Sequence, residues 1–219
     1  RLLLERKAAP DVGDADGTLW KVDVSSNDPA NWTADLAWDG YALSGDTSTM
    51  SEPIQTPPIV SVDPTGNYVI LFSTGDQEQF ANGNSAQTRV WSITEEITNG
   101  AARLKDNWVI PLDQGRRVTG PMALFNSIAY FATFTPTDAN ISACSNGYGS
   151  IWGVDYRLAQ NGAPLPRYAI DPDNLAAGYV THKDQPQGTA VFGVGVTQTP
   201  SCSETEVYND PYLGSRVSV

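Results

Sequence analysis

Short runs of alternating apolar and polar residues recur along the chain, separated by turns rich in Gly, Pro, Asn and Asp. One strand pattern occurs three times, at residues 18–23, 89–94 and 150–155, and each copy has a Trp two residues before a β-branched residue. Because strand side chains alternate between faces, the Trp and that residue share a face. Each copy therefore predicts a strand with one face against a core.

The segments that flank these strands repeat as well. Residues 56–60 lead to the apolar run 68–72, and residues 119–123 lead in the same way to the run 128–132. Repetition at this length predicts a radial or solenoid architecture. Chance similarity between β-rich segments is the alternative, and the same order of features in two full units argues against it.

The remaining pattern predicts further strands and no long helix. The segment 32–38 alternates with Trp32, Ala34, Leu36 and Trp38 on one side, which is the strand period. Asp63 to Asn67 predicts a hairpin turn, and residues 39–55 predict a loop. The other expected strands are 57–62, 67–74, 107–112, 167–170 and 190–197, with 107–112 and 167–170 as the outer strands of their units.

Composition and charge narrow the class of protein. The content of apolar and aromatic residues is sufficient for a core, so the chain is expected to fold. A net charge of −12 opposes general binding to nucleic acid or to anionic membranes, because both are polyanions. No apolar run approaches the length that spans a bilayer. The chain begins at Arg1 without an export sequence, which we interpret as an internal or processed start.

The two cysteines, Cys144 and Cys202, both lie in polar loop sequence. An even pair in an acidic β protein predicts a disulfide formed in an oxidising compartment, with two free thiols as the alternative. Such a bond would tie the third repeat to the C-terminal tail.

Candidate catalytic chemistry is sparse. His182 is the one histidine, and its polar surroundings predict a solvated loop residue and not a general base. The chain contains no nucleophile elbow, zinc-ligand spacing or phosphate-binding loop. We therefore expect that the protein is not an enzyme.

Calcium is the candidate cofactor. Asp14, Asp16 and Asp23 fall at positions of an EF-hand-like loop where carboxylate oxygens surround the ion, although Val12 occupies its first position. The alternative is a hairpin turn, with Asp23 ending its strand. A second acidic stretch, 171–174, has suitable oxygen ligands but is first predicted to be a proline turn.

Two further features each have two interpretations. The recurring residues Trp20, Trp91 and Trp152 are expected in the core between neighbouring sheets, with a sugar-stacking platform as the alternative. The polar loops 76–87 and 135–148 occupy matching places in their units and are suited to recognition, or are simple solvated connections.

Together these segments resemble the C-terminal propeller domain of the PilY family, large secreted proteins associated with type IV pili. Residues 13–23 are similar to that family's Gly-Asp-x-x-Gly-x-Leu-Trp-Arg-x-Asp strand, and Thr56-Pro57-Pro58 with Phe72-Ser73-Thr74-Gly75 is similar to its Thr-x-x-Pro and Phe-Gly-Thr-Gly elements. The segments 118–121, 131–136 and 144–152 continue the match in the same order. The resemblance covers about residues 11–156.

The resemblance implies an all-β fold, a partial β-propeller with about three blades of antiparallel four-stranded sheets. Residues 1–174 would form the blades, a partial one at 11–55 and full ones at 56–118 and 119–174, and residues 175–219 a tail with a further strand or partial blade. Propellers have 4 to 8 blades. Because an open arc exposes sheet faces and edges, we expect this chain to be part of a larger propeller, completed by the rest of its own molecule or by another chain.

The implied function is that of a non-enzymatic adhesin and assembly factor at the tip of a type IV pilus. Its expected partners are minor pilins and a host or abiotic surface, and its expected location is the cell surface after export through the periplasm. The alternatives are a fragment of a periplasmic quinoprotein (PQQ) dehydrogenase and a structural propeller of another extracellular complex.

Overall fold

The computed structural model describes residues 11–39, 52–75, 88–98, 101–112, 115–125, 127–136, 147–156, 182–198 and 215–218. The chain divides into two compact units, residues 1–117 and 118–219. The described residues form antiparallel strands and one short 3-10 turn, Pro29–Asn31. Among them no helix has the length and apolar character needed to cross a membrane. The all-β class predicted from the sequence is confirmed.

The first sheet of the N-terminal unit has three strands, in the order β1 (Asp11–Gly13), β2 (Thr18–Asp23) and β3 (Thr33–Asp39). Trp20 lies on the central strand, opposite Val12 on β1 and Leu36 on β3. Directly opposed residues of an antiparallel pair share a face. Val12, Trp20 and Leu36 therefore form one row across the sheet.

A β-bulge changes the face that Trp38 occupies. Leu19 pairs with Trp38 but Trp20 pairs with Leu36, so Ala37 is an extra residue in β3. Trp38 is only 3% exposed, whereas Leu36 on the opposite face is 52% exposed. The predicted alternation of residues 32–38 on one side is thus wrong, because an inserted residue reverses the alternation.

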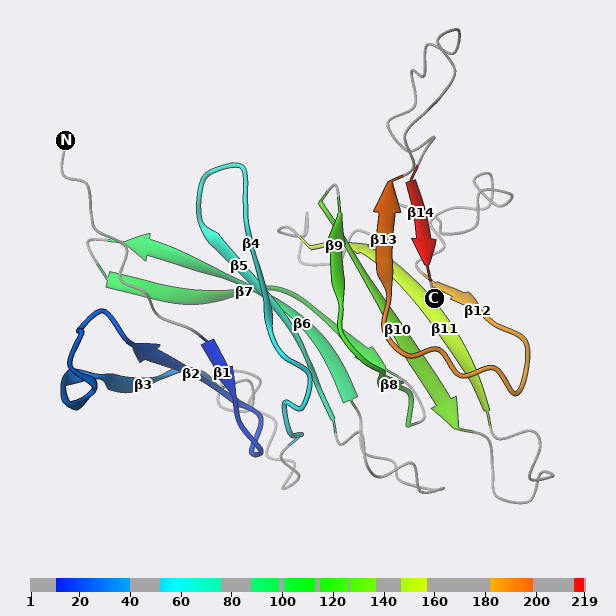
Figure 1. Ribbon diagram of the computed structural model, residues 1–219, viewed down its shortest axis with the longest axis horizontal. Coiled ribbons are helices and arrows are strands. Elements are labelled where there is room, and N and C mark those ends of the chain that lie inside the picture. Colours follow the sequence, from blue (N-terminus) through cyan, green and yellow to red (C-terminus); the bar gives the residue numbers. More distant parts are fainter. Residues whose placement is uncertain are drawn as a thin grey trace, which may run out of the picture. The chain divides into compact units, whose positions relative to one another are not determined.

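The second sheet is a four-stranded meander, β4 (Ile59–Val62), β5 (Tyr68–Thr74), β6 (Thr88–Thr98) and β7 (Ala101–Leu112) (Figure 1). The predicted turn of residues 63–67 joins β4 to β5. Strands β6 and β7 are longer than predicted and contain a second bulge at Asn107. The buried Asn107 side chain donates to Ser92 Oγ (3.0 Å) and accepts from Thr94 Oγ1 (2.8 Å), so the bulge leaves its amide satisfied.

The core of this unit lies between the two sheets. Trp38 of β3 packs edge-on against Phe72 and against Trp91, with ring centroids 4.9 Å apart in both pairs and interplanar angles of 75° and 70°. Its indole N–H donates to Asp106 Oδ1 (3.1 Å) on β7. The other members of the cluster are aliphatic: Leu19, Ile54, Ile70 and Ile93. The first sheet therefore packs on the second through the face opposite to Trp20.

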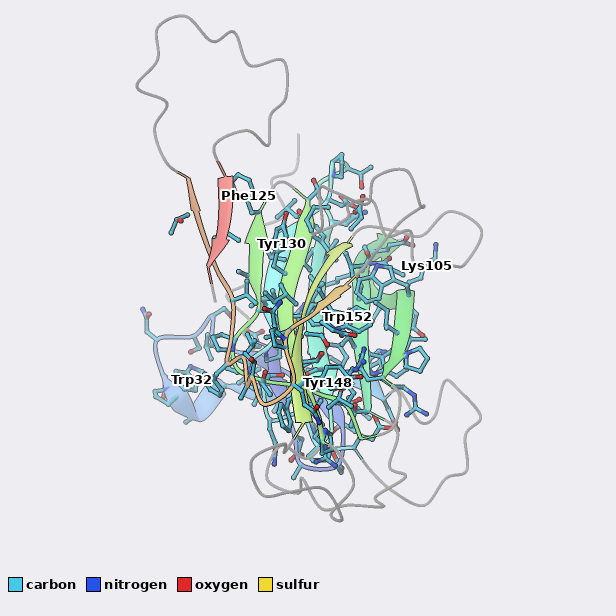
Figure 2. The ribbon with its side chains drawn as sticks, turned by 90° about the vertical axis from the view of Figure 1, so that its right-hand side faces the viewer. Trp32, Lys105, Phe125, Tyr130, Tyr148 and Trp152 are labelled. Carbon is cyan, nitrogen blue, oxygen red and sulfur yellow. The ribbon has the colours of Figure 1, made fainter. Side chains whose placement is uncertain are left out.

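The C-terminal unit contains a five-stranded sheet. Its strands run in the order β12 (His182–Asp184), β11 (Gly147–Asp155), β10 (Ile128–Pro136) and β8 (Arg117–Val118), and β9 (Ala123–Phe125) also pairs with β10. Trp152 lies on β11 (Figure 2), opposite Phe131 on β10 and His182 on β12. The predicted outer strand 167–170 lies outside the described residues.

The second and third sheets repeat the same side-chain arrangement. Phe72 is directly opposite Trp91, and Phe131 is directly opposite Trp152. The rings are stacked in both sheets, at 6.5 Å and 12° in the second and at 5.6 Å and 10° in the third. In each sheet the indole N–H donates to the threonine two residues after the Phe, Thr74 (3.4 Å) or Thr133 (2.9 Å). The predicted equivalence of the Trp strands is therefore confirmed at the level of side chains for these two sheets.

A segment after β12 covers one face of the third sheet. Val191 and Val194 pack on Ala132 and Ile151, the face opposite to Trp152. The main chain of Gly193 donates to Thr119 O (2.7 Å), and its φ of +71° interrupts the extended run. The predicted strand 190–197 is accordingly shorter, β13 (Gly195–Gln198), and pairs with β14 (Ser215–Ser218).

We expect Trp38→Ala to lower the free energy of unfolding by about 3–5 kcal/mol, because it removes a buried indole that contacts two aromatic rings. Trp32→Ala is the matched control, since Trp32, directly before the same strand, is 47% exposed (Figure 2). Its effect should stay below about 1 kcal/mol. Urea unfolding followed by circular dichroism measures both, and equal losses would contradict the packing described here.

Candidate functional site

The carboxylates predicted to bind calcium lie at two ends of one strand. Asp14 and Asp16 are in the turn between β1 and β2, and Asp23 is the last residue of β2. At a rise of about 3.3 Å per residue, β2 keeps Asp23 more than about 15 Å from the turn. The structure does not bring the three together, and no group of three His, Cys, Asp or Glu residues suited to a metal occurs among the described residues. Calcium binding by this loop stays a prediction.

Asp16 instead fixes the first Trp. Its Oδ1 accepts hydrogen bonds from the main-chain N–H of Thr18 (3.3 Å) and from the Thr18 hydroxyl (2.7 Å). The Trp20 indole N–H donates to the same hydroxyl (3.0 Å). The result is a relay from indole to hydroxyl to carboxylate, in which each donor has an acceptor.

The second sheet contains the same relay with a different acid. The Trp91 indole donates to Thr74 Oγ1, and the Thr74 hydroxyl donates to Glu52 Oε2. Glu52 also forms an ion pair with Arg89, which lies opposite Thr74 on β6. Glu52 is buried and lies in the stretch 39–55 that the sequence predicted to be a loop. The one signal that could have identified it is its position just before the Thr56-Pro57-Pro58 element.

A second charged pair joins the two sheets of the N-terminal unit. Lys21 Nζ on β2 contacts Glu95 Oε1 on β6 at 2.5 Å. Asp11 lies opposite Lys21 on β1, and burial raises the pKa of its carboxyl, with the Lys21 charge opposing that shift and Glu95 adding to it. These three groups lie between the first and second sheets, beside the aromatic core. We therefore assign them a role in holding the two sheets together.

The turn between β4 and β5 is organised by Asp63. Its Oδ1 accepts from the main-chain N–H groups of Thr65 and Asn67 (both 2.8 Å) and from the Thr65 hydroxyl (2.7 Å). Slight burial raises the pKa of Asp63, but these hydrogen bonds and one from the Asn67 amide outweigh it and lower the pKa below its usual value. The carboxylate holds the hairpin that positions β4.

His182, which the sequence places in a solvated loop, lies in strand β12. The prediction of a loop is wrong because β11 accepts β12 as a neighbour at Ser150 to Trp152. The Ser150 hydroxyl donates to Asp184 Oδ1 (2.5 Å) at the other end of this pairing. Cys144, Cys202, the acidic stretch 171–174, the loop 76–87 and residues 137–146 lie outside the described residues, so the disulfide stays a prediction.

These features define an all-β chain built from antiparallel, propeller-type sheets. Comparison with solved structures finds the crystal structure of the Pseudomonas aeruginosa PilY1 C-terminal domain, with a TM-score of 0.60 and 14% sequence identity, over 90% of this chain. The chain spans about half of that domain, 55% of its length. No family model and no curated protein matches the chain. The resemblance read from the sequence is therefore confirmed at the level of the fold, as a partial propeller similar to that domain.

Glu52→Gln should destabilise the N-terminal unit by about 3 kcal/mol, because it removes the buried carboxylate that the largely buried Arg89 guanidinium contacts. The Glu96–Lys105 pair (3.6 Å), whose side chains are both substantially exposed, provides the control. Glu96→Gln is expected to cost less than about 1 kcal/mol. Denaturant titrations at low and high salt would distinguish the two pairs, and an equal effect of the two substitutions would refute the structural role of Glu52.

Asp63→Ala should lower the free energy of unfolding by about 1 kcal/mol at neutral pH, because it removes the carboxylate that accepts the hydrogen bonds of the turn. Since the folded pKa is lowered, the stabilisation is present above the unfolded pKa of about 3.9 and is lost as the pH falls through the folded value. The stability difference between wild type and Asp63→Asn should accordingly shrink from pH 6 to pH 2.5. A difference that is unchanged over this range would contradict a charge-dependent role.

Proposed function

We propose that this chain is a propeller segment of a non-enzymatic, surface-exposed protein at the tip of a type IV pilus, acting in pilus assembly and adhesion. The observation that carries the proposal is the likeness of fold to the PilY1 C-terminal domain over 90% of the chain. The ordered motifs in residues 11–156 support it independently of the fold, because they are features of the amino-acid sequence itself.

The arrangement of polar side chains supports a non-enzymatic role. The buried Glu52 and Thr74 form a relay that holds Trp91, and Asp16 and Thr18 form one that holds Trp20. Carboxylates and hydroxyls that are hydrogen-bonded within these relays stabilise the fold and are poorly placed to exchange protons with a substrate. The proposed partners are minor pilins, the completing part of the propeller, and a host or abiotic surface.

Calcium binding in the turn of Asp14 and Asp16, without Asp23 at the far end of β2, and a disulfide between Cys144 and Cys202 remain part of the proposal. A disulfide requires an oxidising compartment, which export through the periplasm would provide. The net charge of −12 is compatible with calcium binding, with simple solubility as the alternative explanation.

The role is tested in the cell that produces the protein. Deletion of its gene should reduce the number of surface pili seen by electron microscopy, and the intact gene should restore it. Immunogold labelling should place the protein at one end of the filaments, and cross-linking should recover minor pilins with it. Normal piliation with label away from the filaments would overturn the proposal. Dye-linked alcohol oxidation by the protein loaded with PQQ would do so too, in favour of a dehydrogenase.

A further inference from the structure

One face of the first sheet is apolar and open. Val12, Trp20 and Leu36 form its central row, with Val12 48% exposed, Leu36 52% exposed and Trp20 half-buried. Val22 and Ala34, which pair with each other, continue the same face. None of these five side chains is charged, and the charged Lys21 and Asp35 lie on the opposite face, while Asp39, opposite Thr18, lies at one end of the apolar face. Contiguous exposed apolar surface of this kind marks an interaction site.

The second sheet shows what covers such a face. Its row of Phe72 and Trp91 corresponds to the row of Val12 and Trp20, since both Trp residues pair with the preceding strand of their sheet. Phe72 and Trp91 are buried, and the group that covers them is Trp38 of the first sheet, packed edge-on. The relay from indole to threonine to carboxylate is also shared, so Trp20 is held for the same kind of contact.

We infer that the Val12–Trp20–Leu36 face binds a further propeller-type sheet, which presents an aromatic or aliphatic side chain edge-on to Trp20. This inference rests on the proposed function, because it places that sheet in the same propeller. The PilY1 C-terminal domain is large enough to contain such sheets, since the chain covers 55% of it.

A second copy of this chain does not fit the face as well. The contact seen in the N-terminal unit joins unlike faces, the Leu19–Trp38 face of one sheet and the Phe72–Trp91 face of the next. A contact between unlike faces adds sheets one after another in the same direction. A two-fold dimer would instead require each copy to contribute the same face. In a second copy the Leu19–Trp38 face is already covered by its own second sheet.

Hydroxyl-radical footprinting with mass spectrometry tests the inference. Oxidation of Trp20 is compared between the 219-residue chain and the polypeptide as the cell produces it, with Phe192, which is 80% exposed, as the exposed reference and Trp91 as the buried one. We expect Trp20 to be oxidised severalfold more slowly, relative to Phe192, in the polypeptide from the cell, and Trp91 to be slow in both. Equal oxidation of Trp20 in the two forms would overturn the inference.

Two variants keep the test specific. Leu36→Lys should restore Trp20 oxidation in the polypeptide from the cell, because it places a charge in the apolar contact. Val62→Lys, at a side chain that is 50% exposed on β4, should leave Trp20 protected. Protection in the 219-residue chain that increases with protein concentration would identify a second copy as the occupant and reject the proposed sheet. Footprinting reports exposure alone, so its failure is distinct from a failure of the pilus role.

Discussion

The edge-on insertion of Trp38 between Phe72 and Trp91 is the contact on which the N-terminal unit depends. Two T-shaped pairs with centroids 4.9 Å apart join two sheets that share no main-chain ladder. Aromatic pairs in this geometry contribute beyond the area they bury. The bulge at Ala37 makes the contact possible, because it moves Trp38 to the face opposite Trp20. A one-residue insertion thus decides which side of the first sheet meets its neighbour.

The same design explains why acids lie beside the tryptophans. A buried indole N–H needs an acceptor, and a threonine hydroxyl that accepts from it can donate to a carboxylate. Asp16 serves Trp20 in this way, and Glu52 serves Trp91 while pairing with Arg89. A carboxylate near a Gly-rich turn can therefore resemble a calcium ligand in the sequence while it orients an aromatic ring in the structure.

The periodic strands could be predicted from the sequence because each carries local evidence. The Trp strands, the turn at Asp63 and the apolar run of β5 agree with the pattern of alternation and turn residues. The face of Trp38 could not be predicted, since a bulge depends on pairing with β2. The burial of Glu52 depends on Arg89, distant in sequence, and the strand at His182 depends on the edge of β11. Each of these three features depends on residues that are distant in the sequence. The partial-propeller arrangement could be predicted only through the resemblance to the PilY family, because local patterns predict strands and not how sheets are arranged.

A double-mutant cycle between Trp38 and Trp91 tests the central claim, that the first sheet packs on the second through the Trp38 indole against the Phe72–Trp91 row. Free energies of unfolding are measured for the two alanine variants and their combination. We expect a coupling energy of about 1 kcal/mol or more, as for other residues in contact. Additivity within about 0.3 kcal/mol would show that the two rings do not meet and would contradict it.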